Sequence, residues 1–462
     1  MSNNANANTQ YARLIISGIL FIWTLSIFLP GAYSIDSWNQ FNEVTGGRYD
    51  DWYGTGMVIT WRRLWLLTGS FMSLFVAQMV LYWTFFTALL WTVRLKNPIY
   101  WLTMGLALFF CFIPQYVMRD SLMVLAWGLA ALFLLYAANS ETRRRTLTIL
   151  GLLFFAYGLW VRINTLIAIL PLAYVCVLFL GGSRLAIWKQ ALITLGGCIV
   201  LFLGSQFMTY RVQKAAHTYP EYKLKLLDLT GISKMSGENY FPEAIRNFPG
   251  FNLDTLYRRY TPADLDEIYW PEDGKRIFPY PTDSINSSVT RSWLSAIRHH
   301  PWDYFQNRFT GFIYYLHLRK RLGPMEYWNV SAFWIQPNGP LPVKMEPTKL
   351  KERISNMYLW FYPTILFDPW LWLLFNLAGF AFFFYKCRKE PGDKAWLVHA
   401  CVQLSGVFFI LSQLLIYQHD RDFRYSYWSV FVVFLAIPGI FGVRSPKKAG
   451  AKRQGAGVSP TP

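Results

Sequence analysis

Ten long, nearly uncharged runs constrain this chain more than any other feature. A transmembrane helix needs about 20 consecutive apolar residues, and only 15% of the side chains are charged, against about 25% in soluble domains. The sequence therefore predicts an all-α polytopic membrane protein. The runs lie at about 14–32, 66–93, 98–118, 121–140, 146–161, 163–182, 190–210, 366–385, 395–417 and 425–443.

The basic side chains predict the orientation of these helices. The formal net charge is +18, but it is spread over short segments between the runs, so it does not indicate a nucleic-acid partner. Cytoplasmic loops of membrane proteins collect Lys and Arg, and a cytoplasmic N-terminus places every basic cluster on that side. The clusters are Arg94 and Lys96, Arg143 to Arg145, Arg184 and Lys189, Lys386 to Lys394, and Arg444 to Arg453.

This orientation divides the chain into four parts. Residues 1–210 form an N-terminal transmembrane core with a first outer loop at 33–65, and residues 211–365 form an extracytoplasmic insert that is expected to be of mixed structure. Residues 366–443 form the C-terminal helices, and 444–462 a disordered basic tail. Apolar spacing predicts interfacial helices at 37–44 and 57–67 of the first loop and at 289–318 of the insert, where Pro301 starts a new turn.

Polar residues collect in the predicted outer turns, and Asp36 stands out among them. It follows the first apolar run directly, and an ionisable residue at the mouth of a membrane helix is costly and usually functional. Asp120, in the turn before the fourth helix, is expected at the same level. One carboxylate could take a proton from an acceptor hydroxyl while the other orients it or holds a divalent cation, Mg²⁺ or Mn²⁺. Alternatively, each caps the helix that follows it.

Arginines in the same turns suggest an anionic ligand. The guanidinium of Arg162 can bond two phosphate oxygens at once, or it can extend to lipid headgroups instead. Arg424 offers the same alternatives. In the insert, His299 lies on the predicted helix and could contact a phosphate or donate a proton to the leaving group. The substrate-binding candidates are Asp51, Arg119, Arg162, Asn164, Arg298, His299 and Arg424.

The order of these features resembles the GT-C superfamily of multispan glycosyltransferases. Its members include oligosaccharyltransferases, protein O-mannosyltransferases and aminoarabinose transferases, and they take sugars from polyprenyl-phosphate carriers. The resemblance lies in the stretches Asp36-Ser37-Trp38-Asn39-Gln40, Asp50-Asp51-Trp52, Arg162-Ile163-Asn164 and Asp422-Phe423-Arg424-Tyr425. Relatives often read Asp-Trp-His-Pro where this chain reads Asp51-Trp52-Tyr53-Gly54. The resemblance implies Asp36 as general base and Asp120 as second carboxylate.

The expected function is transfer of a sugar from a polyprenyl-phosphate donor to a glycan, lipid or protein acceptor. The expected location is the bacterial inner membrane, in contact with its lipids and with the active site on the extracytoplasmic face. No nucleotide-binding fingerprint is present, which agrees with a lipid-linked donor. A flippase of lipid-linked sugars and a polysaccharide polymerase are the rival interpretations. A transporter usually places its charges near the midplane and shows repeated halves, whereas these charges gather at one face.

Overall fold

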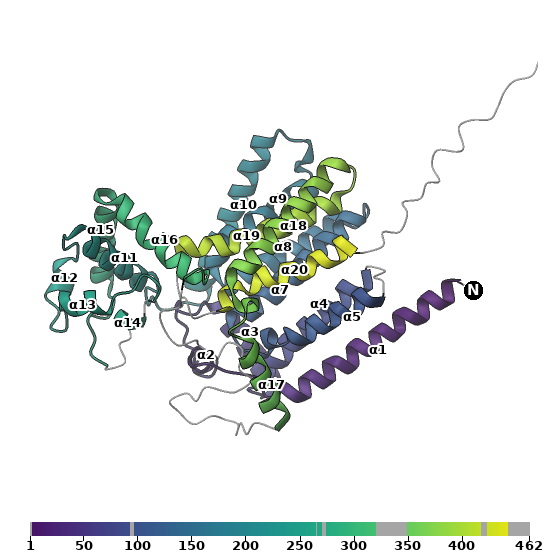
Figure 1. Ribbon diagram of the computed structural model, residues 1–462, viewed down its shortest axis with the longest axis horizontal. Helices are drawn as coiled ribbons and strands as arrows, with labels where there is room; N and C mark the ends of the chain where they lie inside the picture. The colour runs from purple at the N-terminus through teal and green to yellow at the C-terminus, as the bar shows by residue number, and fades with distance from the viewer. Residues whose placement is uncertain are drawn as a thin grey trace, which may run out of the picture.

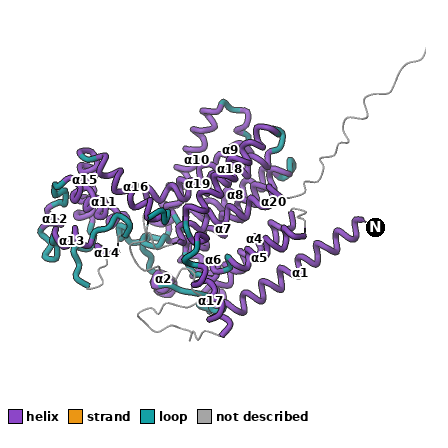
Figure 2. Tube along the Cα trace, in the orientation of Figure 1, coloured by secondary structure: helices purple, strands orange, loops and turns teal. Residues whose placement is uncertain are grey.

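The computed structural model describes residues 2–92, 97–264, 266–269, 274–319, 349–416 and 423–441. Within these ranges the chain is built of helices and contains no strand, only three isolated bridges (Figure 2). The predicted all-α class is therefore confirmed. The basic tail at 444–462 lies outside the described residues.

The predicted membrane helices are present. In the described part of the chain, nine helical segments are long and apolar enough to cross a membrane, and a tenth, Ile163–Phe179, is apolar but shorter. This tenth segment holds α9 (Leu166–Phe179). The nine contain α1 (Ser2–Phe28), α4 (Ser73–Thr92), α5 (Asn97–Phe109) with α6 (Phe112–Gln115), α7 (Arg119–Asn139), α8 (Arg144–Val161), α10 (Ile187–Phe207), α18 (Pro369–Lys389), α19 (Lys394–Ile416) and α20 (Tyr427–Phe441).

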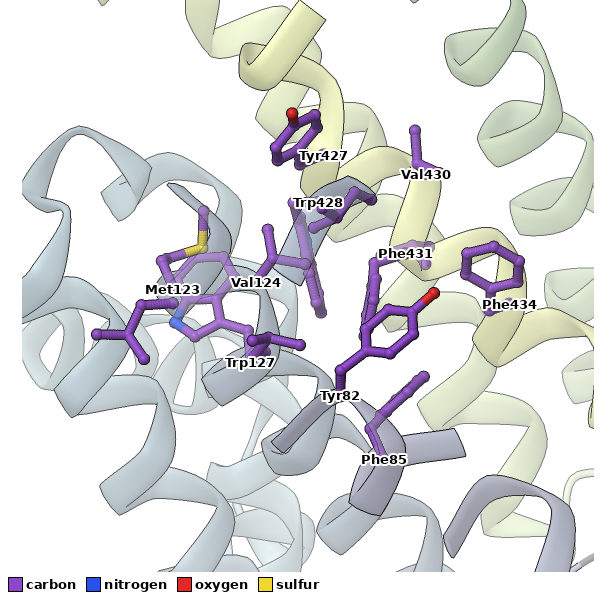
Figure 3. Packing of buried hydrophobic residues seen from close by; sticks show 14 of the residues in the cluster. Tyr82, Phe85, Met123, Val124, Trp127, Tyr427, Trp428, Val430, Phe431 and Phe434 are labelled. Carbon is purple, nitrogen blue, oxygen red and sulfur yellow. The ribbon is translucent and has the colours of Figure 1, made fainter. Parts of the chain in front are cut away.

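The helices differ in how deeply they lie in the bundle. More than 70% of the residues in the spans of α7, α19 and α20 are buried, whereas 22% of those in the span of α1 are. The helix α1 runs along one edge of the bundle (Figure 1). The centre is packed with aromatic rings from α4, α7 and α20 (Figure 3). Phe85 and Phe431 lie 4.4 Å apart between ring centroids. A Cβ at Gly128 would come within 2.6 Å of Phe431, so this close packing requires a glycine.

The loops predicted to share one side of the membrane meet at one end of the bundle. The residues after α1 pair with the turn before α7, because Ala32 N–H donates to the Gln115 carbonyl and Val117 N–H donates to the Ala32 carbonyl. The predicted first-loop helices are α2 (Ile35–Gly46) and α3 (Thr55–Thr68). Gly56 in α3 lies directly against the backbone at the end of α8. We call this end, where Asp36 and Val117 lie, the outer end, and the opposite end the inner end.

The insert was expected to be of mixed structure, but its described part is helical. Its part from about 221 to 311 forms a separate lobe beside the outer end (Figure 1) and has its own apolar core, whereas its last helix packs against the bundle through Tyr358. The predicted break at Pro301 is present, because α15 ends at His299 and α16 begins at Pro301. The helices of the insert are α11 (Glu221–Ser236), α12 (Glu243–Arg246), α13 (Leu253–Arg259), α14 (Asp266–Tyr269), α15 (Asp283–His299), α16 (Pro301–Tyr315) and α17 (Lys349–Phe361).

A buried ion pair holds the lobe together. Arg308 of α16 lies 2.7 Å from Asp228 of α11, with both side chains at most 2% exposed. The Trp293 indole N–H also donates to Asp228, at 2.8 Å. The last turn of α16 joins the lobe to the bundle, since the Tyr315 hydroxyl donates to the Tyr425 carbonyl at 3.0 Å.

Candidate functional site

The start of α2 fixes Asp36 at the outer end. Ser34 caps the helix in a reciprocal pair of hydrogen bonds with Ser37, which satisfies two of the donors that a helix start leaves open. The Ser37 hydroxyl also donates to the Val117 carbonyl at 2.6 Å. These bonds anchor the first turn of α2 to the segment that leads into α7.

Asp36 accepts from two side chains and remains partly open. Arg424 Nη1 lies 3.3 Å from one carboxylate oxygen, and the Tyr53 hydroxyl donates to the other at 3.3 Å. The Asp36 side chain is 38% exposed, against 13% for Arg424. Burial, with Asp36 nearby, raises the pKa of Tyr53, so its hydroxyl keeps its proton. Asn39 Nδ2 donates to the Tyr53 oxygen at 3.0 Å and orients it.

Two more cations border this carboxylate. Arg119 donates to the Trp52 carbonyl at 2.9 Å, and its guanidinium lies 5.9 Å from the centre of the Tyr53 ring. Lys223, in the first turn of α11, lies 4.6 Å from the centre of the Trp52 ring. Burial lowers the pKa of Lys223, the carboxylates of Asp266 and then Asp36 act to raise this pKa, and the guanidinium groups of Arg119 and Arg424 act to lower it. Arg424 therefore pairs with Asp36, while Arg119 and Lys223 lie next to it at Trp52 and Tyr53. We call these four residues the Asp36 cluster.

Asp120 does not face the opening. It forms an ion pair with Arg162, and the two side chains are 1% and 2% exposed. The guanidinium carbon of Arg162 also lies over the Tyr425 ring, 4.9 Å from its centre, and that of Arg424 lies 5.3 Å from the centre of the same ring. The expectation of Asp120 as a carboxylate at the outer surface thus needs correction, because burial with Arg162 removes both side chains from solvent. The pair lies behind the Asp36 cluster and packs against it through Tyr425.

Asp51 connects the first outer loop to the start of the insert. It accepts from the Tyr210 hydroxyl at 2.9 Å and from the backbone N–H of Thr218 at 2.7 Å. His217 Nδ1 lies 3.4 Å from the same carboxylate, whose side chain is 8% exposed. These bonds give Asp51 a holding role between loop and insert, and the ligand contact expected from its sequence stays a prediction.

The remaining candidates are not brought into the cluster. Asn164 is half-buried in the short turn Ile163–Thr165. Arg298 and His299 are exposed at the end of α15, and His299 Nδ1 bonds the Ser295 carbonyl at 2.8 Å. Of the nine residues predicted from the sequence, Asp36, Arg119 and Arg424 form the open cluster, and Asp120 and Arg162 support it.

The sequence interpretation missed Lys223, Tyr53 and Glu43. Lys223 lies in a segment of weak periodicity, and Tyr53 is an uncharged side chain within the first outer loop. Glu43, two turns after Asp36 in α2, accepts from the Asp50 N–H at 3.3 Å. Burial, together with the Asp50 carboxylate, raises the pKa of Glu43 to about 8. A carboxyl group of this kind keeps its proton at neutral pH.

No group of three or more His, Cys, Asp and Glu side chains that could hold a metal ion occurs among the described residues. Asp36 and Asp120, the two expected ligands, are each paired with an arginine. Comparison with family models, curated proteins and solved structures finds no match for this chain. The class that the fold itself defines is a helical multi-pass membrane protein with a helical lobe at its outer end.

Proposed function

We propose that this chain is a membrane glycosyltransferase that moves a sugar from a polyprenyl-phosphate donor to an acceptor hydroxyl at the outer end. The proposal rests on one observation above all: a partly open carboxylate, Asp36, lies among three cations beside the membrane-spanning helices. The GT-C resemblance of the sequence supports the same function.

Asp36 supplies the base. Sugar transfer forms a bond between the acceptor oxygen and the anomeric carbon, and the bond from that carbon to the phosphate oxygen breaks. The acceptor proton passes to Asp36, which must be ionised and within hydrogen-bond reach of the hydroxyl. The bonds from Arg424 and Tyr53 fix the carboxylate, while its exposed part remains open to the acceptor.

The cations receive the leaving group. The departing polyprenyl phosphate gains negative charge as the bond to the sugar breaks, and preorganised positive groups stabilise such charge strongly where water is partly excluded. Arg119 lies next to Trp52 and Tyr53, and Lys223 lies over the Trp52 ring. They can contact phosphate oxygens while Arg424 remains with Asp36. In this proposal Asp120 and Arg162 are positioning residues.

The test is carried out in cells that lack the chain. Their envelope glycans and lipids are compared with those of cells complemented by the wild type, by Asp36→Asn or by Asp254→Asn, a matched change at an exposed carboxylate of α13. We expect one sugar to be missing in the deletion strain, restored by the wild type and Asp254→Asn, and still missing with Asp36→Asn at an equal membrane level. Full restoration by Asp36→Asn, or accumulation of lipid-linked oligosaccharide, would count against the proposal.

A further inference from the structure

A groove between α1 and α4 opens towards the membrane. Near the outer end the two helices are joined, because the Trp83 indole N–H donates to the Thr24 hydroxyl at 2.9 Å. Towards the inner end a groove of about 490 Å³ separates them, within the ~300–1,000 Å³ range of ligand pockets. Its walls are mainly apolar and include Leu14, Gly18, Phe21, Val80, Trp83 and Trp91.

The length of the groove matches one leaflet. A narrow extension, lined by Gln10, Arg13 and Tyr100 among others, continues the groove towards the inner end. Groove and extension together follow α1 from Gln10 to Phe21, which corresponds to roughly 16 Å at about 1.5 Å per residue. One leaflet of the hydrocarbon core is about half of ~30 Å. A membrane-spanning helix from a partner needs the full thickness, so the groove suits a single lipid chain better.

The inner end of the groove is positively charged. Arg13 lines the extension, with its guanidinium 4.7 Å from the centre of the Tyr100 ring. Among the described residues that line the groove and its extension, Arg13 alone carries a charge. Trp91 and Tyr100 line the extension together with Arg13, as expected for aromatic residues at a membrane–water interface. Basic side chains at this depth attract anionic headgroups.

We propose that this groove binds one acyl chain of an anionic glycerophospholipid from the leaflet opposite Asp36, with the lipid phosphate at Arg13. The apolar walls remove the chain from contact with neighbouring lipids, and Arg13 selects the headgroup. This site is separate from the Asp36 cluster and does not depend on the proposed sugar transfer.

The test uses the full-length protein in phosphatidylcholine vesicles with a small share of phosphatidylglycerol that carries a photoreactive acyl chain. After irradiation, the labelled peptides are located by mass spectrometry. Phosphatidylcholine with the same photoreactive chain is the headgroup control. Gly18→Leu fills the groove, since a Cβ there meets no atom within 4 Å. Gly197→Leu is the matched control on the lipid-facing helix α10, where a Cβ is equally free.

We expect the anionic probe to label residues 10–21 and 80–91 severalfold more than the neutral probe. Gly18→Leu should reduce this labelling severalfold, and Gly197→Leu should leave it unchanged. Arg13→Gln should lower the preference for the anionic probe about fivefold, the size expected for one basic side chain at an anionic surface. Equal labelling of the groove and α10, equal labelling by both probes, an unchanged Gly18→Leu variant, or a crosslink between two copies of the chain through the groove would overturn the proposal.

Discussion

The change Asp120→Asn tests whether this carboxylate stabilises the fold or takes part in the chemistry. It leaves the Arg162 guanidinium buried without its counter-charge, and both side chains are at most 2% exposed. Removing one partner of a buried ion pair costs about 3–5 kcal/mol. A domain is stable by only about 5–15 kcal/mol, so the loss should be a large part of the free energy of unfolding.

The assay is reversible unfolding in mixed detergent micelles, followed by helix content. The double variant Asp120→Asn with Arg162→Met should recover much of the lost stability, because an apolar replacement of both partners is often neutral. Glu141→Gln is the control. It removes the partner of Arg144 in an exposed pair, where Glu141 is 93% exposed and the atoms lie 4.0 Å apart, and such pairs contribute about 0–1 kcal/mol.

One result would refute this reasoning. If Asp120→Asn unfolds like the wild type but has lost sugar transfer, Asp120 acts in the chemistry and not in positioning. An unstable double variant would likewise show that the pair is not the source of the effect.

Four further changes test other parts of the structure. Lys223→Gln should lower the kcat of transfer from the lipid-linked donor about 10²-fold with a smaller effect on the KM, because Lys223 is proposed to stabilise the charge of the departing phosphate. Lys225→Gln, whose amine instead bonds Asn286 and Thr290, should leave kcat unchanged in the same transfer assay. The pKa of Glu43 is raised from 4.5 to about 8 in the fold, so its contribution to stability is complete below pH 4.5 and is lost as the pH rises to about 8. Glu43→Gln should flatten that part of the curve of unfolding free energy against pH. An unchanged curve would contradict the raised pKa of Glu43. Gly128→Leu should lower the free energy of unfolding by about 1–3 kcal/mol or more by overpacking against Phe431, whereas Gly197→Leu should not. Asp51→Asn should increase proteolysis at the start of the insert, because it weakens the bonds to Tyr210 and Thr218; wild-type resistance would be the contrary outcome.

Much of the fold could be predicted because the membrane imposes simple patterns. Apolar length and charge placement predicted the helices, apolar spacing predicted α2 and α3, and Pro301 marked the break between α15 and α16. The grouping of the predicted outer loops at one end follows from the same rules, since consecutive spanning helices alternate in direction.

The side-chain partners could not be predicted in this way. Asp120 and Arg162 were both expected to face a ligand, yet they neutralise each other inside the protein. Their pairing depends on the packing of helix ends that are distant in sequence, and no local pattern reports it. Lys223 reaches the Asp36 cluster only because the lobe folds back on the first loop, as its contact with Trp52 shows.

The most direct test of the proposed chemistry is sugar transfer by the purified protein in vesicles. The donors are polyprenyl-phosphate-linked sugars extracted from the source membranes, and the acceptor is the envelope fraction of cells that lack the chain. For Asp36→Asn, the account predicts a transfer rate about 10²–10⁴-fold below that of the wild type, the usual contribution of a general base, with unfolding unchanged. A rate equal to that of the wild type would contradict it.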